Sequence, residues 1–137
     1  MSKFAVIDTE TTWGDDVMSI GIVIAGSQNF MPLDRRYYIL TPFKNYGGMY
    51  SCALYADSTI HDMECLREAA IDDIKRFLAV NAVSEIFAYN ALFDYGHLPE
   101  LSYLNWYDIM KMAAYRQYNR KIPPYADCYS TGRLKRG

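Results

Sequence analysis

Two groups of polar residues in this sequence have the types and spacing to do chemistry. The first, Asp8-Thr9-Glu10, follows the apolar run of residues 4–7. Side chains at i and i+2 of a strand point to the same face, with Cα atoms roughly 6 to 7 Å apart, so both carboxylates can reach one cation. Hard oxygen ligands of this kind select Mg²⁺ or Mn²⁺. A D-x-E pair alone is a weak signal, because two solvated acids at a strand end are the commoner case.

The second group is Asn90 and Asp94, in residues 88–94, where a predicted strand gives way to a predicted helix. Asn90 stands at a natural N-cap position, and Asp94 follows one helical turn later. An ordinary capping Asn beside a surface Asp would give the same pattern. Ligands in open α/β sheets collect at the carboxyl ends of strands, where both groups are expected. Together they predict that Asp8, Glu10 and Asp94 converge.

The elements that must position these residues begin with an antiparallel meander. Residues 4–7 and 17–25 are apolar and rich in β-branched side chains, which predicts buried strands. Gly26-Ser27 is a plausible hairpin turn that leads through Phe30 to a third strand at residues 37–40.

Beyond a predicted loop at residues 41–57, strands alternate with helices. Apolar residues at spacings of three and four predict an amphipathic helix from about Asp62 to Leu78. Two further strands, at residues 86–89 and 104–107, are each followed by a predicted helix, at about 91–101 and 109–119. This order predicts an α/β fold with a mixed sheet, in which parallel strands follow the meander and helices flank the sheet.

Length and composition predict a single domain over residues 1–137. With 51% apolar and 22% charged residues, the chain can bury a core of its own. The apolar run at residues 4–7 is too short for a signal peptide or a membrane-spanning helix, so we expect a cytoplasmic protein with no membrane partner. Cys52, Cys65 and Cys128 lack the close spacing of a zinc or redox site, so we expect reduced thiols.

The net charge of −2 is unevenly distributed along the chain. Residues 1–108 hold 7 basic and 15 acidic side chains, whereas residues 109–137 hold 7 basic side chains and one acidic side chain, Asp127. A basic segment of this kind could draw a polyanion toward an acidic site. Solvated lysines and arginines on a helix and a tail would give the same counts.

Three stretches of the sequence resemble motifs of the DEDD exonucleases, the group that contains the proofreading epsilon subunit of bacterial polymerase and oligoribonuclease. FAVIDTETT at residues 4–12 resembles the first motif, and AYNALFD at residues 88–94 resembles the second, in which an Asn precedes an apolar pair and an Asp. WYDIM at residues 106–110 is similar to the family's next strand. The resemblance covers nearly the whole chain in the expected order.

The resemblance implies a ribonuclease H-like fold and an enzyme that removes nucleotides from single-stranded or frayed 3′ ends of DNA or RNA. It also implies that Asp8, Glu10 and Asp94 are three of the four acids that bind two divalent ions, Mg²⁺ or Mn²⁺. In two-metal hydrolysis one ion activates water, and both stabilise charge on the attacking and leaving oxygens.

The family's last motif has no counterpart in this sequence. That motif supplies a fourth Asp and a general base, as H-x-x-x-x-D or Y-x-x-x-D. Neither His61 nor His97 is followed by an Asp at that distance, and neither Asp108 nor Asp127 has a Tyr four positions before it. We therefore expect a domain shortened before its final catalytic helix, with little or no activity in this form. Trimming or proteolysis is the preferred explanation, ahead of a naturally shortened relative or a site completed by another chain.

Four residues are predicted to contact the substrate. The resemblance implies that Thr11 and Thr12 give backbone or hydroxyl contacts to the last nucleotide, and Asn90 belongs to the same set. Trp13 stands where the first motif usually continues with Gly. An exposed Trp there could stack on a terminal base, a contact worth about 1 to 3 kcal/mol. A Trp that covers the sheet edge is the alternative, and His97 is expected to be a surface residue.

Two other functions fit parts of the pattern. A haloacid-type phosphatase also starts with an acid after its first strand, but its chemistry needs a second Asp where Glu10 stands. A non-catalytic nucleic-acid or protein interaction module that keeps the fold is the stronger alternative. The sequence does not distinguish DNA from RNA, since that choice depends on contacts to a 2′-hydroxyl.

Overall fold

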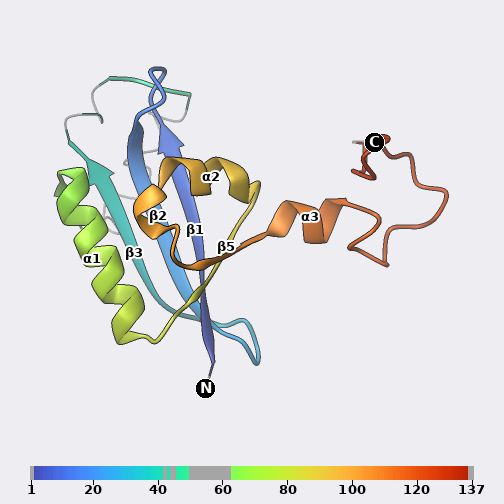
Figure 1. Ribbon diagram of the computed structural model, residues 1–137, viewed down its shortest axis with the longest axis horizontal. Helices are drawn as coiled ribbons and strands as arrows, with labels where there is room; N and C mark the ends of the chain where they lie inside the picture. Colours follow the sequence, from blue (N-terminus) through green and yellow to red (C-terminus); the bar gives the residue numbers. More distant parts are fainter. Residues whose placement is uncertain (1, 42, 44–45, 50–62, 136–137) are drawn as a thin grey trace.

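A mixed β-sheet forms the centre of the molecule. The structure, a computed structural model, describes residues 2–41, 43, 46–49 and 63–135. Within these residues the sheet has six strands in the order β4-β3-β2-β1-β5-β6 (Figure 1). Their bounds are β1 Lys3–Thr11, β2 Val17–Gly26, β3 Pro32–Leu40, β4 Met63–Cys65, β5 Glu85–Ala88 and β6 Asn105–Asp108.

The strand directions confirm the predicted fold class. β1, β2 and β3 form an antiparallel meander, and β5 and β6 continue the sheet in parallel on the other side of β1. β1 is therefore a central strand. It continues through Thr11, four residues beyond the predicted end at Ile7, because its ladder with β2 runs on to the pair of Thr11 and Val17.

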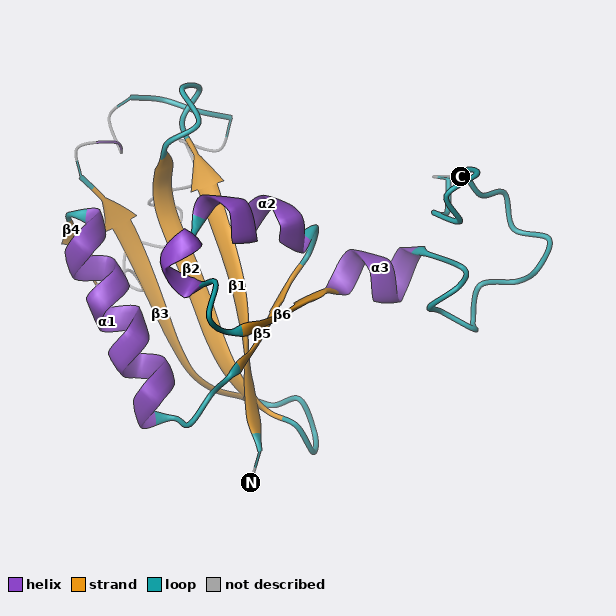
Figure 2. Ribbon diagram, viewed as in Figure 1, coloured by secondary structure: helices purple, strands orange, loops and turns teal. Residues whose placement is uncertain are grey.

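Helix α1, Arg67–Val80, covers one face of the sheet (Figure 2). The predicted start near Asp62 was wrong, because the helix begins at Arg67. Asp62 itself lies outside the described residues. Residues 63–65 instead form β4, parallel to β3. Met63 and Cys65 alternate with Glu64 in the period of a strand and pack against the core. The buried residues of α1 are Ala70, Ile71, Ile74, Phe77 and Leu78.

The other predicted helices are shorter than expected. α2 spans Ala91–His97, followed by a 3₁₀ turn at Pro99–Leu101, because Leu98 precedes a proline and has the non-helical angles φ −127° and ψ 61°. α3 spans Ile109–Ala114 and ends where the extended Tyr115 bridges Arg133. The chain after α3 extends away from the sheet (Figure 1).

The two faces of β1 meet different surroundings. Ala5, Ile7 and Thr9 are buried on the face that α1 covers, in the main core. The alternate residues of β1 lie on the second face, where four rings form a row across the sheet. Phe4 contacts Phe30 and Phe87, and Phe87 stacks on Tyr107, at centroid distances of 5.9, 5.2 and 5.0 Å.

The structure can be compared with the expectations for the cysteines, for the loop at residues 41–57 and for membrane-spanning helices. Cys65 and Cys128 are free thiols, and Cys52 lies outside the described residues. Most of the predicted loop at residues 41–57 also lies outside them. In the part of the chain that the structure describes, every helix is too short or too polar to span a bilayer.

Candidate active site

The first acid pair lies within β1 and not after it. Asp8 and Glu10 share the face of the strand opposite α1, as their i and i+2 spacing predicts, and Asp8 is near enough to contribute to the raised pKa of Glu10. A register shift in the ladder between Glu10 and Thr11 follows directly. The regular part of β1 therefore holds both acids in a fixed relation to each other.

The electrostatics of the acids show that they are close enough to interact. The pKa of Glu10 is raised to about 7, first by burial and then by the nearby charges of Asp8 and Asp94. The pKa of Asp94 is also raised, mainly by burial and further by Asp8, although hydrogen bonds from Thr9 oppose the change. Ionised together at neutral pH, the three carboxylates repel one another, and a divalent cation would relieve that repulsion.

Asp94 is tied to β1 through Thr9. Its side chain is 2% exposed, and its Oδ1 accepts hydrogen bonds from the Thr9 amide at 3.0 Å and the Thr9 hydroxyl at 2.6 Å. Thr9 stands between Asp8 and Glu10, with its side chain on the buried face of the strand. These bonds fix α2 against the segment that carries the acid pair. Sequence reasoning missed Thr9, whose hydroxyl among the apolar residues of a core face was the available signal.

Replacing Asp94 by Ala is expected to lower the free energy of unfolding by about 2 kcal/mol, because the Thr9 amide and hydroxyl would lose their acceptor in a buried position. Asp94→Asn keeps an acceptor oxygen and should cost less. Urea unfolding followed by circular dichroism measures both variants. An Asp94→Ala protein as stable as the parent would show that these bonds contribute nothing.

Asn90 occupies the N-cap position of α2 in a way that sequence reasoning did not predict. Its backbone is left-handed, with φ 62° and ψ 58°, and its side chain makes no capping bond. Asn is one of the few residues that adopt this conformation at low cost. The Asn90 amide donates to Oδ1 of Asp108 at 3.0 Å, and the same oxygen accepts from the Met110 amide at 2.9 Å. Asp108, to which no role was assigned from the sequence, thus positions Asn90 and caps α3.

One cavity of about 400 Å³ brings together all seven predicted site residues. It is lined by Asp8, Thr9, Glu10, Thr11, Thr12, Trp13, Met49, Tyr89, Asn90, Phe93 and Asp94. Met49, Tyr89 and Phe93 were missed, since their place at the rim depends on tertiary packing. A larger cavity lies beyond Asn90.

Two of the predicted substrate contacts differ in their freedom to bind. Trp13 is 72% exposed, so it does not serve as a cover for the sheet edge. Thr12 is buried, and its hydroxyl accepts from the Asp16 amide at 3.2 Å within the turn between β1 and β2. The Thr12 hydroxyl is therefore engaged in the turn itself.

Gly47 and Gly48 hold the end of β1 in place. The Gly47 carbonyl accepts from the Trp13 amide at 3.0 Å. A Cβ atom at Gly48 would collide with the Thr11 carbonyl oxygen, so this close approach requires glycine. The position of Trp13 at the rim depends on this contact.

The three carboxylates line one cavity without forming a metal-binding cluster in the described part of the chain. Among residues 2–41, 43, 46–49 and 63–135, no group of three or more His, Cys, Asp or Glu side chains is arranged to hold a metal ion. Asp8 and Glu10 fit a shared cation by their hard oxygen donors and by the raised pKa of Glu10. Since Oδ1 of Asp94 is bonded to Thr9, the three-carboxylate metal site stays a prediction.

His97 joins α2 to the turn after β1. Its Nε2 lies 2.7 Å from Oδ1 of Asp15, and its Nδ1 lies 2.7 Å from the Phe93 carbonyl oxygen. Burial lowers the pKa of His97, but the Phe93 carbonyl and the Asp15 carboxylate outweigh it, so the pKa is raised. The expected free surface residue is therefore a partly buried, paired one.

The raised pKa of His97 makes its contribution to stability depend on pH. Because the folded state holds the proton more tightly, this contribution is fully present below 6.5, the ordinary pKa of a histidine, and is lost as pH rises through the folded-state pKa. NMR titration of the His97 ring protons should give a pKa above 6.5, and Asp15→Asn should lower it. A parent value at or below 6.5 would contradict the prediction.

Comparisons with known proteins bear on the fold. The structure is similar to the nuclease domain of 3′hExo, a DEDDh family member, bound to rAMP, with a TM-score of 0.61 and 15% identity over 88% of this chain and 72% of that one. It is also similar to Exonuclease X in complex with 5′ overhanging duplex DNA, with a TM-score of 0.48 and 17% identity over 90% and 66% of the two chains. No family model and no curated protein matches the sequence. The chain therefore shares the ribonuclease H-like fold of that nuclease domain.

Proposed function

We propose that this chain is a metal-dependent 3′-5′ exonuclease domain that hydrolyses phosphodiester bonds at the 3′ ends of nucleic acids. The observation that carries the proposal is the meeting of Asp8, Glu10 and Asp94 at one cavity, where burial and then the charges of Asp8 and Asp94 raise the pKa of Glu10 to about 7. Perturbed carboxylates gathered in a cavity are typical of functional sites. The fold shared with a nuclease domain supports the same conclusion.

Asp8 and Glu10 would provide most of the metal-binding oxygens, and Asp94, whose Oδ1 is bonded to Thr9, would contribute less. Bound Mg²⁺ or Mn²⁺ ions would supply an activated water and charge stabilisation for the leaving oxygen. Thr9 keeps Asp94 in position, and the ladder between β1 and β2 fixes the spacing of the acid pair. The chain's own contribution is therefore a preorganised set of negative charges.

The rim of the cavity suits a terminal nucleotide. Trp13, Tyr89 and Phe93 present exposed or partly exposed rings on which a base can stack. A volume of about 400 Å³ lies within the range of small-ligand sites. The similar nuclease domain was solved bound to rAMP, which supports a nucleotide ligand here. Single-stranded or frayed 3′ ends of DNA or RNA are the proposed substrates.

An interaction module without catalysis is the second candidate function. It is favoured by one observation, the two hydrogen bonds from Thr9 that engage Oδ1 of Asp94. Such a module would bind nucleic acid or protein through the same cavity without hydrolysis.

Incubation with end-labelled DNA and RNA oligonucleotides tests the proposal. Stepwise shortening from the 3′ end in Mn²⁺, abolished by EDTA, is the expected result. We expect weak activity from these 137 residues and stronger activity from a form extended by a helix with a fourth acid, since one more ligand would help to balance two dications. Metal-independent binding without shortening by either form would favour the interaction module.

A further inference from the structure

A second cavity, of about 610 Å³, lies between α2, β6 and α3. We name it the α2–α3 groove, and its lining is mainly aromatic and apolar, with one lysine and one aspartate. The lining residues that matter here are Leu92, Tyr95, Tyr107, Lys111, Met112 and Tyr118. All of its named aromatic and apolar members are exposed, and Tyr118 is the most open of its tyrosines at 62%.

Two tyrosines of the groove are held from behind by other rings. Tyr107 stacks on Phe87 with an angle of 23° between the ring planes. Tyr95 meets Trp106 edge to face at 5.6 Å, and the Trp106 indole donates to the Leu101 carbonyl at 2.9 Å. Both tyrosines remain about 40% exposed. Rings that are fixed in this way offer a surface for stacking at little cost in entropy.

The groove adjoins the cavity that holds the carboxylates. Asn90 lines both, and the start of α2 separates them, with Leu92 in the groove and Phe93 and Asp94 in the cavity. The Asp108 carboxylate, which also lines the groove, holds the Asn90 amide in place. A strand that leaves the cavity over Asn90 would enter the groove directly.

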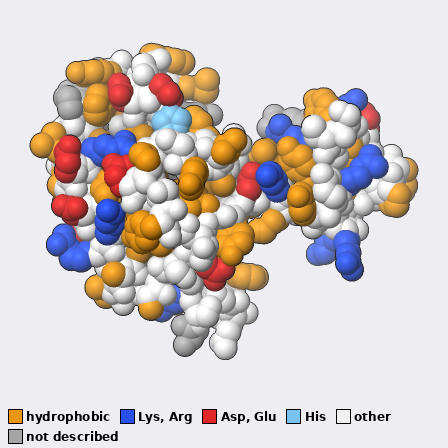
Figure 3. Space-filling model, in the orientation of Figure 1, with side chains coloured by type: hydrophobic (Ala, Val, Ile, Leu, Met, Phe, Trp, Pro, Cys, Tyr) orange, Lys and Arg blue, Asp and Glu red, His pale blue; other side chains and the backbone are white. Residues whose placement is uncertain are grey.

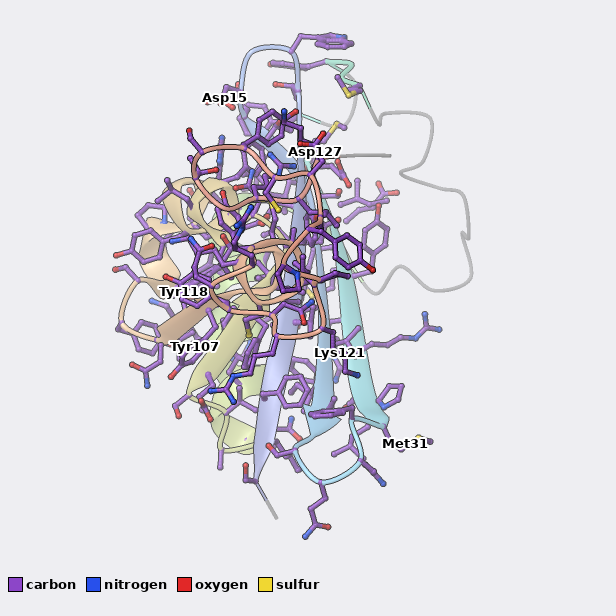
Figure 4. The ribbon with its side chains drawn as sticks, turned by 90° about the vertical axis from the view of Figure 1, so that its right-hand side faces the viewer. Asp15, Met31, Tyr107, Tyr118, Lys121 and Asp127 are labelled. Carbon is purple, nitrogen blue, oxygen red and sulfur yellow. The ribbon has the colours of Figure 1, made fainter. Side chains whose placement is uncertain are left out.

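The charge around the groove suits a polyanion. Its lining holds Lys111 and Asp108, whose carboxylate accepts from the Asn90 and Met110 amides, and residues 109–137 hold seven basic side chains against the single Asp127. Figure 3 shows Lys and Arg groups spread over the part of the molecule that follows α3. Figure 4 looks toward that part, and Tyr107 of β6 and Tyr118 are labelled on the same side of this view. Rings flanked by basic groups are the usual construction of a single-strand binding surface.

We propose that the α2–α3 groove binds the unpaired nucleotides that precede the 3′-terminal one, with bases on its tyrosines and a phosphate at Lys111. The direction of the strand rests on the proposed function, because that function places the 3′ end in the cavity. Binding by the groove itself does not require hydrolysis.

Fluorescence anisotropy with labelled oligo(dT) and oligo(U) in EDTA tests this binding. An oligomer of about 8 nucleotides should bind more tightly than one of about 2, because only the longer strand can fill the groove. Tyr118→Ala should weaken binding of the longer strand about fivefold or more, which corresponds to about 1 kcal/mol for one stacked base. Tyr118→Phe keeps the ring and should bind like the parent. A difference between the two oligomer series would identify the preferred sugar.

Lys111→Gln should make oligonucleotide binding depend less steeply on salt concentration. Loss of one phosphate contact to a single strand changes the slope of log K against log salt by about 0.7. Tyr103→Ala and Lys75→Gln are matched controls. Tyr103 is 63% exposed, close to the value for Tyr118, and Lys75 of α1 lies 5.9 Å from its ring, outside the groove. Both controls should bind like the parent.

The outcomes separate this inference from the proposed function. Unchanged binding by Tyr118→Ala and Lys111→Gln would overturn the proposal that the α2–α3 groove binds nucleotides, even if the parent shortens oligonucleotides. Tyrosine-dependent binding without any shortening would support the groove and count against the exonuclease. A parent that sediments as a dimer, and that Tyr118→Ala converts to a monomer, would show that a second copy covers the groove, which would also overturn the inference.

Discussion

Asp8→Asn is expected to abolish Mn²⁺-dependent shortening of oligonucleotides, with a loss on the order of a thousandfold in kcat/KM. Removing a residue that merely orients a metal ligand costs about 10- to 100-fold, so removing a ligand should cost more. Asp8 is exposed, so its replacement should leave the fold intact. The rate of product formation is measured in the most active form of the protein, and isothermal titration with Mn²⁺ measures the loss of binding in the present chain.

Asp72→Asn is the matched control for charge. Asp72 is an exposed acid of α1 and does not line the cavity. Its replacement by Asn changes the net charge by the same amount as Asp8→Asn. It should bind Mn²⁺ and turn over like the parent. An Asp8→Asn protein that keeps more than about a tenth of the parent rate would place the metal ligands elsewhere.

Mn²⁺ affinity is expected to fall about tenfold for each pH unit below 7, because Glu10, whose pKa is about 7, must release its proton before it can bind the metal. The same pKa predicts that the metal-free protein loses stability as pH rises from 4.5 to about 7. The folded state binds the proton more tightly than the unfolded state in that window, so the rise in pH favours unfolding. The loss should be on the order of 1 kcal/mol, since solvent screens a partly exposed carboxylate.

Glu10→Gln separates these effects from other titrations. The variant should be more stable than the metal-free parent at about pH 8 and should lose most of the difference at about pH 4.5. Urea midpoints at the two pH values provide the measurement, with EDTA present throughout. Equal stability of the two proteins at the higher pH would mean that Glu10 does not carry the raised pKa.

The central sheet and the acid pair could be predicted because both depend on local pattern. The alternation of apolar residues in β1 determines which face is buried, and the same alternation places Asp8 and Glu10 together. The meander and the parallel strands followed from the order of apolar runs and turn residues. Metal binding and the role of the three acids as one set are still predictions.

The parts that sequence reasoning missed depend on contacts between distant residues. The bonds between Thr9 and Asp94 span 85 positions, so the polar Thr9 on a core face is visible in the sequence but its partner is not. The left-handed Asn90 donates its amide to a partner, Asp108, that lies 18 positions away. The helix predicted at about 91–101 was too long for a local reason that the pattern did contain, since Pro99 restricts the residue before it. The early end of α3 instead accompanies the bridge between Tyr115 and the distant Arg133. The pairing of His97 with Asp15 likewise arises only when α2 packs beside the turn.

The Asp108 carboxylate makes hydrogen bonds at the boundary between the acidic cavity and the α2–α3 groove. One of its oxygens accepts from Asn90 at the mouth of the acidic cavity and from Met110 in the first turn of α3. The backbone at Asn90 and the start of α3 therefore depend on the same carboxylate. Asp108→Ala would remove the acceptor of both amides, so its effect would reach the wall that the cavity and the α2–α3 groove share.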